Sequence, residues 1–530
     1  MTDYEIAKSK NIKNILDITK EYLLDEKDIM LYGSDKAKIT SIPKKNKLGK
    51  LILVTSVNPT PYGEGKTTLS IGIHDTLCSL KKKSVVVLRE PSLGPVFGTK
   101  GGATGGGMSQ IVPMDDINLH FTGDMHAITS ANNLLAAIID NHIFSGNELE
   151  IDQVCFERCL DINDRALRNI SLKNRQDQFN ITPASEIMAI LCLSKDMNDL
   201  KHNLGNIVIG YNKNGKEIYA CDLDCVDALA ILLKDAIHPN LVQTLENNLA
   251  IVHGGPFANI AHGCSSIRSI QLGLNIADYV ITEAGFGSDM GGIKFFDITC
   301  RKGGFFPNLV VVNTTIRSLK YNGNNQSDLE TGICNLEFHI QNMKRLCDNV
   351  LVVLNKFEDD SEKDISFVEQ YCLNLGVSFE ISTCYKEGSK GGISIVKRME
   401  EMLEKKVESN ILYPLDINLK QKIEIIVKDY LHAKNIIYSD RALQKIELLQ
   451  QGSLSNLPIC IAKTQYSISD NAKLLGNPKD FEVTITDIKL NNGAGFITIY
   501  MGNIITMPGL SKKANYVNMK YDGEKIEGLF

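Results

Sequence analysis

The chain has 530 residues, enough for roughly three or four domains, and its 43% hydrophobic and 23% charged residues are those of an ordinary globular protein. A net charge of −6 without a long basic run argues against a nucleic-acid partner, and no apolar run reaches the roughly 18 residues that would suggest a membrane partner. Thirteen cysteines without a CxxC pair, and an N-terminus without an apolar signal region, predict a reducing, cytoplasmic location.

The first forty or so residues have the pattern of amphipathic helix and turn. An apolar, β-branched run at 51–57 then predicts a strand, and residues 69–80 predict a helix. Between them, residues 60–68 read TPYGEGKTT, which is the strand–loop–helix context of a phosphate-binding P-loop. Thr60 stands where the strict pattern has Gly, so a glycine-rich turn before a helix is the alternative.

This loop has the residue types that bind phosphate and magnesium. Gly63 and Gly65 allow backbone conformations barred to other residues and let the chain approach an anion. The N–H groups of the loop and of the following helix N-terminus would point at phosphate. Lys66 would reach the outer phosphates, and the Thr67 hydroxyl would help to hold magnesium.

Charged and glycine-rich residues follow the next expected strand, 84–88. Arg89 and Glu90 come directly after it, and ligands of open α/β sheets bind beyond the carboxyl ends of strands. Arg89 would therefore approach the same phosphate with its planar fork of donors, although a surface Arg paired with a carboxylate is the alternative. The glycine cluster that begins at Lys100 (KGGATGGG) predicts a backbone anion cradle or a flexible lid, and Lys100 favours the cradle.

Several apolar runs without sustained alternation predict a parallel sheet buried on both faces. Helical stretches between them, as at 130–141 and 225–236, give the rhythm of a doubly wound fold. We therefore predict an α/β fold, with a P-loop-type, mostly parallel sheet flanked by helices and additional smaller α/β domains. The expected strands are 51–57, 84–88, 249–253, 279–282, 309–313 and 350–354.

Composition predicts a division into three domains. Residues 1–125 and 246–330 would form a discontinuous P-loop nucleotide-binding domain. Residues 145–245 are polar, charged and mostly helix-patterned, which predicts a mainly helical insertion or second domain over residues 126–245. Residues 331–530 would form a C-terminal α/β domain that contributes to the ligand site.

Together these segments resemble the formate–tetrahydrofolate ligase family, nearly from end to end. The resemblance implies that ATP phosphorylates formate to formyl phosphate, whose formyl carbon is then attacked by the amine at position 10 of tetrahydrofolate. The products are 10-formyltetrahydrofolate, ADP and phosphate. The strings that carry it include TPYGEGKTT at 60–68, REPSLGPVFGTKGGATGGG at 89–107, PMDDINLHFTGD at 113–124, VHGGPFANIAHG at 252–263, TEAGFGSD at 282–289 and LPICIAKTQYSISD at 457–470.

The resemblance also implies roles for individual residues. It places Arg89 on formyl phosphate and Asp124 near the pterin, where a carboxylate could hydrogen-bond ring N–H groups. Asp124 and Glu90 are candidates for removing the proton from the attacking amine. Lys66, Arg89 and magnesium would neutralise charge as one anion attacks another. The residues implied at the ATP site are Thr60, Pro61, Tyr62, Gly63, Glu64, Gly65, Lys66 and Thr67.

In the family an aromatic pair sandwiches a flat ligand ring, and it maps to Phe357 and Tyr385. The family has Trp at the second place, whereas this chain has no Trp, so Tyr385 offers a smaller stacking face. Plain core packing is the alternative for Phe357. Further departures at Ile293 and Asn322 lie towards the folate side.

The resemblance implies formate, ATP with magnesium, and tetrahydrofolate with or without a polyglutamate tail as ligands. It also implies a homotetramer and support of activity by a monovalent cation. Two alternatives stay open: an ATP-using enzyme with another acceptor amine, and a nucleotide-binding paralogue without ligase activity.

Overall fold

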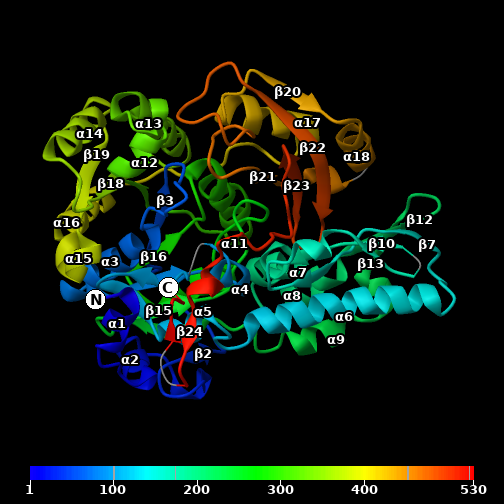
Figure 1. Cartoon of the computed structure of the whole chain (residues 1–530). Coiled ribbons are helices and arrows are strands. Elements are labelled where there is room, and N and C mark those ends of the chain that lie inside the picture. Colours follow the sequence, from blue (N-terminus) through cyan, green and yellow to red (C-terminus); the bar gives the residue numbers. More distant parts are fainter. Residues whose placement is uncertain (100–101, 174, 451–452, 524–525, 530) are drawn as a thin grey trace.

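The computed structural model describes residues 1–99, 102–173, 175–450, 453–523 and 526–529. Within these residues, a twelve-stranded sheet is flanked by helices, and smaller sheets lie in the middle and C-terminal parts of the chain (Figure 1). The predicted fold class, a mostly parallel α/β sheet with smaller α/β parts, is confirmed.

The parallel strands of the large sheet lie side by side. All six strands expected from the sequence are present, each with its ends within one residue of the expected bounds. In spatial order the strands are β15 (Leu249–Val252), β4 (Ser84–Leu88), β16 (Tyr279–Glu283), β3 (Lys50–Ser56), β17 (Leu309–Thr314), β18 (Val350–Asn355) and β19 (Ser378–Ser382).

Helices cover both faces of this sheet, because successive side chains of each strand point to opposite faces. Leu51 and Leu53 of β3 belong to one buried cluster, together with α10 (Ile267–Ile276) and α13 (Leu329–Leu346). Ile52 and Val54 of the same strand belong to the other cluster, together with α3 (Lys66–Ser79) and α16 (Ile393–Leu403). This double burial explains why the strands are continuous apolar runs.

Antiparallel strands extend the sheet beyond β15. They are β14 (Asn240–Thr244), β2 (Ala37–Ile39), β1 (Ile29–Leu31), β6 (Ser109–Val112) and β5 (Gly105–Gly106).

The large sheet therefore draws on residues outside the expected P-loop segments 1–125 and 246–330. Strand β14 lies before residue 246, while β18 and β19 lie after residue 330. The division of the chain into domains stays a prediction.

The expected helical insertion, residues 126–245, contains both helices and short strands. Its longest element, α6 (Asp124–Phe144), runs along the molecule, as Figure 1 shows in cyan. The other elements include α7 (Glu186–Leu193), α8 (Met197–Gly205), α9 (Val226–Leu232), β7 (Ile151–Val154), β12 (Val208–Asn212) and β13 (Glu217–Tyr219).

The C-terminal part carries a sheet of its own, beside α17 (Leu419–Glu424) and α18 (Asp440–Gln450) (Figure 1). Its strands, in order, are β20 (Asn435–Tyr438), β22 (Glu482–Asn491), β23 (Phe496–Met501) and β21 (Ile459–Ala462). Among the helices of the described residues, none is both long and apolar enough to cross a bilayer.

Candidate active site

The expected P-loop joins the carboxyl end of β3 to the first turn of α3. Gly63 (φ 80°) and Gly65 (φ 67°) both have left-handed backbone conformations, which glycine adopts without strain. Gly65 is the N-cap of α3, and within the described residues no side chain caps this end of the helix. The geometry is that of an anion-binding helix N-terminus.

Thr60 and Glu64 fix the shape of the loop. The Thr60 backbone N–H and hydroxyl both donate to Glu64 Oε1, at 3.0 and 2.5 Å. The other Glu64 oxygen accepts from the Thr315 hydroxyl, and the Glu64 backbone carbonyl accepts from the Asn313 and Asn355 amides, each at 2.9 Å. Thr60 therefore gains a bond that the Gly of the strict pattern could not make. Glu64 is 5% exposed, so its carboxylate accepts hydrogen bonds from the protein and is almost fully shielded from solvent.

Three of the predicted phosphate-binding side chains meet at the carboxyl end of β16. Lys66 Nζ donates to the backbone carbonyls of Ala284 and of Phe286 (2.8 Å). The Thr67 hydroxyl donates to Glu283 Oε2 at 3.0 Å, and Arg89 Nη2 lies 3.9 Å from Glu283 Oε1. The sequence alone did not single out Glu283 as a site residue, although it follows an expected strand in a glycine-rich segment.

Arg89 lies in a narrow place beside the P-loop. Its guanidinium lies against Gly285, where a Cβ atom would come within 2.9 Å of Nη1. Nη1 donates to the Pro256 carbonyl at 3.2 Å, whereas the buried Nε has no hydrogen-bond partner within the described residues. Arg89 is thus not a surface arginine in a tight ion pair, since 3.9 Å is long for such a pair and donors of its fork stay available to an anion.

Asp124, at the start of α6, is held in a buried ion pair that the sequence did not predict. Lys38 Nζ lies 2.8 Å from one oxygen of Asp124 and 2.9 Å from the other, and the two side chains are 0% and 2% exposed. The Asn240 amide also donates to Asp124, at 2.8 Å. Burial raises the pKa of Asp124, while the charge of Lys38 and its hydrogen bond oppose the shift.

Glu90 lies close enough to this pair to be influenced by its charges. It is 4% exposed, and its Oε2 atom has no hydrogen-bond partner within the described residues. Burial, followed by the negative charge of Asp124, raises the pKa of Glu90 well above its ordinary value, while Lys38 opposes the shift. Burial thus raises the pKa of both candidates for proton removal, and Asp124 is the one in direct contact with Lys38.

Part of the expected anion cradle forms a tight hairpin instead. Gly105 and Gly106 form β5, residues 107 and 108 turn into β6, and Gly107 N–H donates to Asp3 of α1 (Asp3–Lys8) at 3.0 Å. This amide is therefore not available to an anion. Lys100, the predicted phosphate contact of the cluster, lies outside the described residues.

Phe357 follows the end of β18, and Tyr385 lies in α15 (Cys384–Glu387), just after the neighbouring strand β19. An ion pair between Glu358 and Lys386 (3.0 Å) joins the two segments. Phe357 is 40% exposed and Tyr385 57%, so plain core packing does not describe Phe357. The Tyr385 hydroxyl donates to Asp3 at 3.0 Å.

The Arg317 guanidinium joins Phe357 to the tip of the P-loop. It lies 4.7 Å from the ring centroid of Phe357 and 5.7 Å from that of Tyr62, and it donates to the Gly63 carbonyl at 2.6 Å. These distances are those of cation–π contacts. Pro61 and Tyr62 form an exposed tip beside this cluster.

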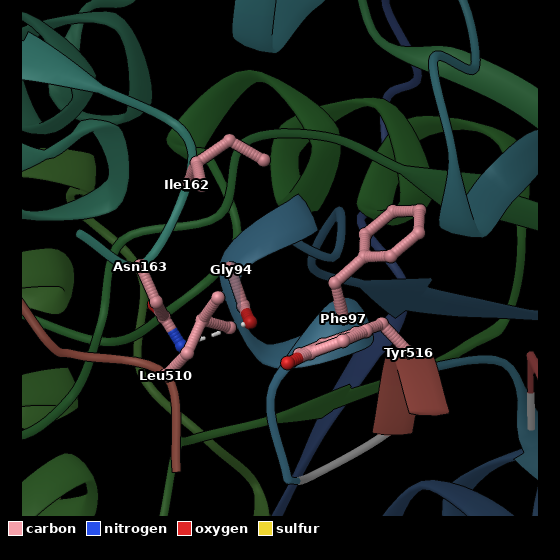
Figure 2. A pocket seen from close by; sticks show the side chains of 6 residues that line it. All are labelled: Gly94, Phe97, Ile162, Asn163, Leu510 and Tyr516. Carbon is pink, nitrogen blue, oxygen red and sulfur yellow. Dashed lines mark hydrogen bonds between the residues drawn. The ribbon is translucent and has the colours of Figure 1, made fainter. Parts of the chain in front are cut away.

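A small hollow lies beside α4 (Leu93–Phe97), the helix that follows Arg89 and Glu90 in the chain. Its volume is about 230 Å³, and Asn163 closes one side by donating from its amide to the Gly94 carbonyl at 3.0 Å (Figure 2). None of its described lining residues is charged, so it suits an apolar or aromatic group rather than an anion. The lining residues are Gly94, Phe97, Ile162, Asn163, Leu510 and Tyr516.

Comparison with known proteins adds two findings. A family model described as "Formate--tetrahydrofolate ligase" matches residues 1–530. A protein named "Formate--tetrahydrofolate ligase" from Campylobacter concisus (strain 13826) is 49% identical over 548 aligned residues, which cover 100% of both chains.

Proposed function

The chain belongs to the formate–tetrahydrofolate ligase family and catalyses the ATP-dependent ligation of formate to tetrahydrofolate in one-carbon metabolism, and we propose that it does so through formyl phosphate made at the carboxyl end of β16. Formate would attack the terminal phosphoryl group of ATP, and tetrahydrofolate would then take the formyl group from phosphate.

The observation that carries this proposal is the convergence of Lys66, Thr67 and Arg89 at one strand end. Attack of formate on a phosphoryl group brings two anions together, so catalysis depends on positive charge and aligned donors rather than on a covalent intermediate with the protein. Lys66 would neutralise the outer phosphates, and the free donors of Arg89 would hold the formyl phosphate oxygens.

Magnesium fits the donor set at the P-loop. In P-loop proteins a Ser or Thr at the position of Thr67 holds the magnesium ion through its hydroxyl. Magnesium prefers oxygen ligands of this kind. When bound, the ion would neutralise phosphate charge and help align the reacting groups. We propose no residues for the monovalent cation, which stays a prediction.

The folate side of the proposal rests on Asp124, Glu90, Phe357 and Tyr385. Asp124, in direct contact with the Lys38 ammonium, is the better candidate for accepting the proton of the attacking amine, because Lys38 favours its ionised form whereas burial raises the pKa of Glu90 well above its ordinary value. The exposed faces of Phe357 and Tyr385 would take the flat ring of a ligand by stacking.

The ligase activity is tested directly by measuring ADP release in the presence of ATP, magnesium and formate, with and without tetrahydrofolate. We expect release that needs tetrahydrofolate and equals the 10-formyltetrahydrofolate formed. Release that needs a different amine would favour an altered acceptor. ATP binding without turnover, in folded protein, would favour a paralogue without ligase activity.

The family resemblance also supports a homotetramer. Size-exclusion chromatography with light scattering would test this by measuring the molar mass of the protein in solution. Acceptance of polyglutamylated tetrahydrofolate and a cytoplasmic location stay predictions.

A further inference from the structure

We propose that Glu283 is a second protein group of the magnesium site and acts beside Thr67. The proposal rests on the function proposed above for the P-loop, and it assigns a role to a carboxylate that the phosphate-binding residues surround.

The sheet order places Glu283 where a P-loop metal site needs an acidic residue. β16 lies between β4 and β3 and runs parallel to both. Glu283 is the last residue of β16 and is paired with Val54 of β3, two residues before that strand ends. Because the carboxyl ends of parallel strands meet at one edge, Glu283 emerges between the P-loop and Arg89. In P-loop proteins the ion is held by the Ser or Thr of the loop and by an acidic residue of the Walker B motif.

The hydrogen bond between Thr67 and Glu283 orients the hydroxyl for a cation. A carboxylate oxygen can only accept, so Thr67 Oγ1 donates its proton to Glu283 Oε2 across 3.0 Å. Its lone pairs then point away from Glu283 and stay available to a hard cation. Glu283 therefore holds Thr67 in the orientation that metal ligation requires and adds negative charge beside the ion.

The charge around Glu283 favours the same conclusion. Glu283 is 4% exposed, and the arginine nearest to it is 3.9 Å away, which is too long for a close ion pair. Desolvating a carboxylate is costly and Arg89 does not contact it closely, so a cation beside Glu283 is favourable. Glu64, the other carboxylate of the loop, differs because its oxygens already accept from Thr60 and Thr315.

Measuring metal affinity distinguishes a role of Glu283 in the magnesium site from a purely structural role. Mn²⁺ would replace magnesium as an electron paramagnetic resonance probe, titrated in the presence of saturating ADP, and ADP affinity would be measured separately without metal. The variants are Glu283→Gln and Glu283→Asp. Asp75→Asn is the matched control, because Asp75 is a buried carboxyl group on the same helix as Thr67 and, within the described residues, its hydrogen bonds come from Thr244 and Asn248 rather than from the P-loop.

We expect Glu283→Gln to weaken Mn²⁺ binding by about 10-fold or more, while metal-free ADP affinity and the Mn²⁺ affinity of the control stay near wild type. Glu283→Asp keeps the charge, so its Mn²⁺ affinity should lie between those of Glu283→Gln and wild type. This variant replaces Glu283→Gln in the test if the latter does not fold. Mn²⁺ affinity within twofold of wild type in folded Glu283→Gln would overturn the proposal. So would an equal loss of metal-free ADP binding, which would make Glu283 a structural support. Failure of the wild-type protein to bind ADP would instead overturn the proposed P-loop function, and the inference with it.

Discussion

The Thr60 hydroxyl and the Glu64 carboxylate close the P-loop from within, through a hydrogen bond of 2.5 Å. Replacing Thr60 with Gly restores the strict P-loop pattern but removes this bond and frees the backbone. We expect the variant to bind ATP about fivefold more weakly, since a hydrogen bond contributes about 1 kcal/mol. Thr60→Ser keeps the hydroxyl and should resemble wild type in the same titration. Unchanged ATP affinity in Thr60→Gly would show that the bond does not shape the site.

Lys66→Ala should abolish ATP turnover while the protein stays folded. The side chain supplies a positive charge at this end of α3, where its ammonium donates to the backbone carbonyls of Ala284 and Phe286. Steady-state ADP release and circular dichroism together check the prediction. Near-normal turnover in a folded variant would remove the P-loop from the mechanism.

Arg89→Ser should impair formate activation more than ATP binding. The guanidinium has donors to spare for an anion beside the P-loop, whereas Lys66 and the helix N-terminus bind the nucleotide without it. Formate-dependent ADP release and the dissociation constant of ATP would be compared in one preparation. The prediction would be contradicted if ATP bound much more weakly to the variant while the ATP complex that still formed reacted with formate at the normal rate.

Tyr385→Trp should tighten ligand binding at the aromatic pair. The larger indole increases the stacking surface, and Tyr385 is 57% exposed, so part of its ring is open to a ligand. Tyr385→Phe is the control, because it keeps the ring and loses only the bond to Asp3. Equal affinities of wild type and Tyr385→Trp for both ATP and tetrahydrofolate would argue against a stacking role.

The Asp75 carboxyl should make stability depend on pH. It is fully buried on α3, where Thr244 and Asn248 donate to Oδ1 at 2.6 and 2.7 Å. Burial raises its pKa from 3.8 to about 8, and the nearby Glu246 adds to the shift. Between these two values the folded protein binds more protons than the unfolded chain, so this carboxyl lowers the free energy of unfolding as the pH rises.

Asp75→Asn removes that titration. The Tm difference between variant and wild type should therefore grow in favour of the variant as the pH rises from about 4 to about 8 and stay level above that. Thermal unfolding at a series of pH values measures it. A difference that does not change with pH would mean that Asp75 keeps its ordinary pKa in the fold.

The sequence predicted the large sheet well because parallel strands buried on both faces are apolar at every position, as in Ser84–Leu88 and Leu309–Thr314. The strand–loop–helix segment around residues 60–68 was equally visible, because its residues are consecutive. The short strands of the 126–245 segment were missed because they are brief and half exposed, as β7 shows. Partners far apart in the chain leave no local pattern, which is why the Lys38–Asp124 pair and the Thr67–Glu283 bond required the structure.

Transfer of oxygen from formate to phosphate tests the central claim most directly. If the formate oxygen attacks the terminal phosphorus and the bond from the formyl carbon to that oxygen then breaks, formate labelled with ¹⁸O must leave one labelled oxygen in each phosphate released. Mass spectrometry of the phosphate, with ATP, magnesium and tetrahydrofolate present, should show this single label. Phosphate without label, released as 10-formyltetrahydrofolate forms, would contradict a formyl phosphate intermediate at the end of β16.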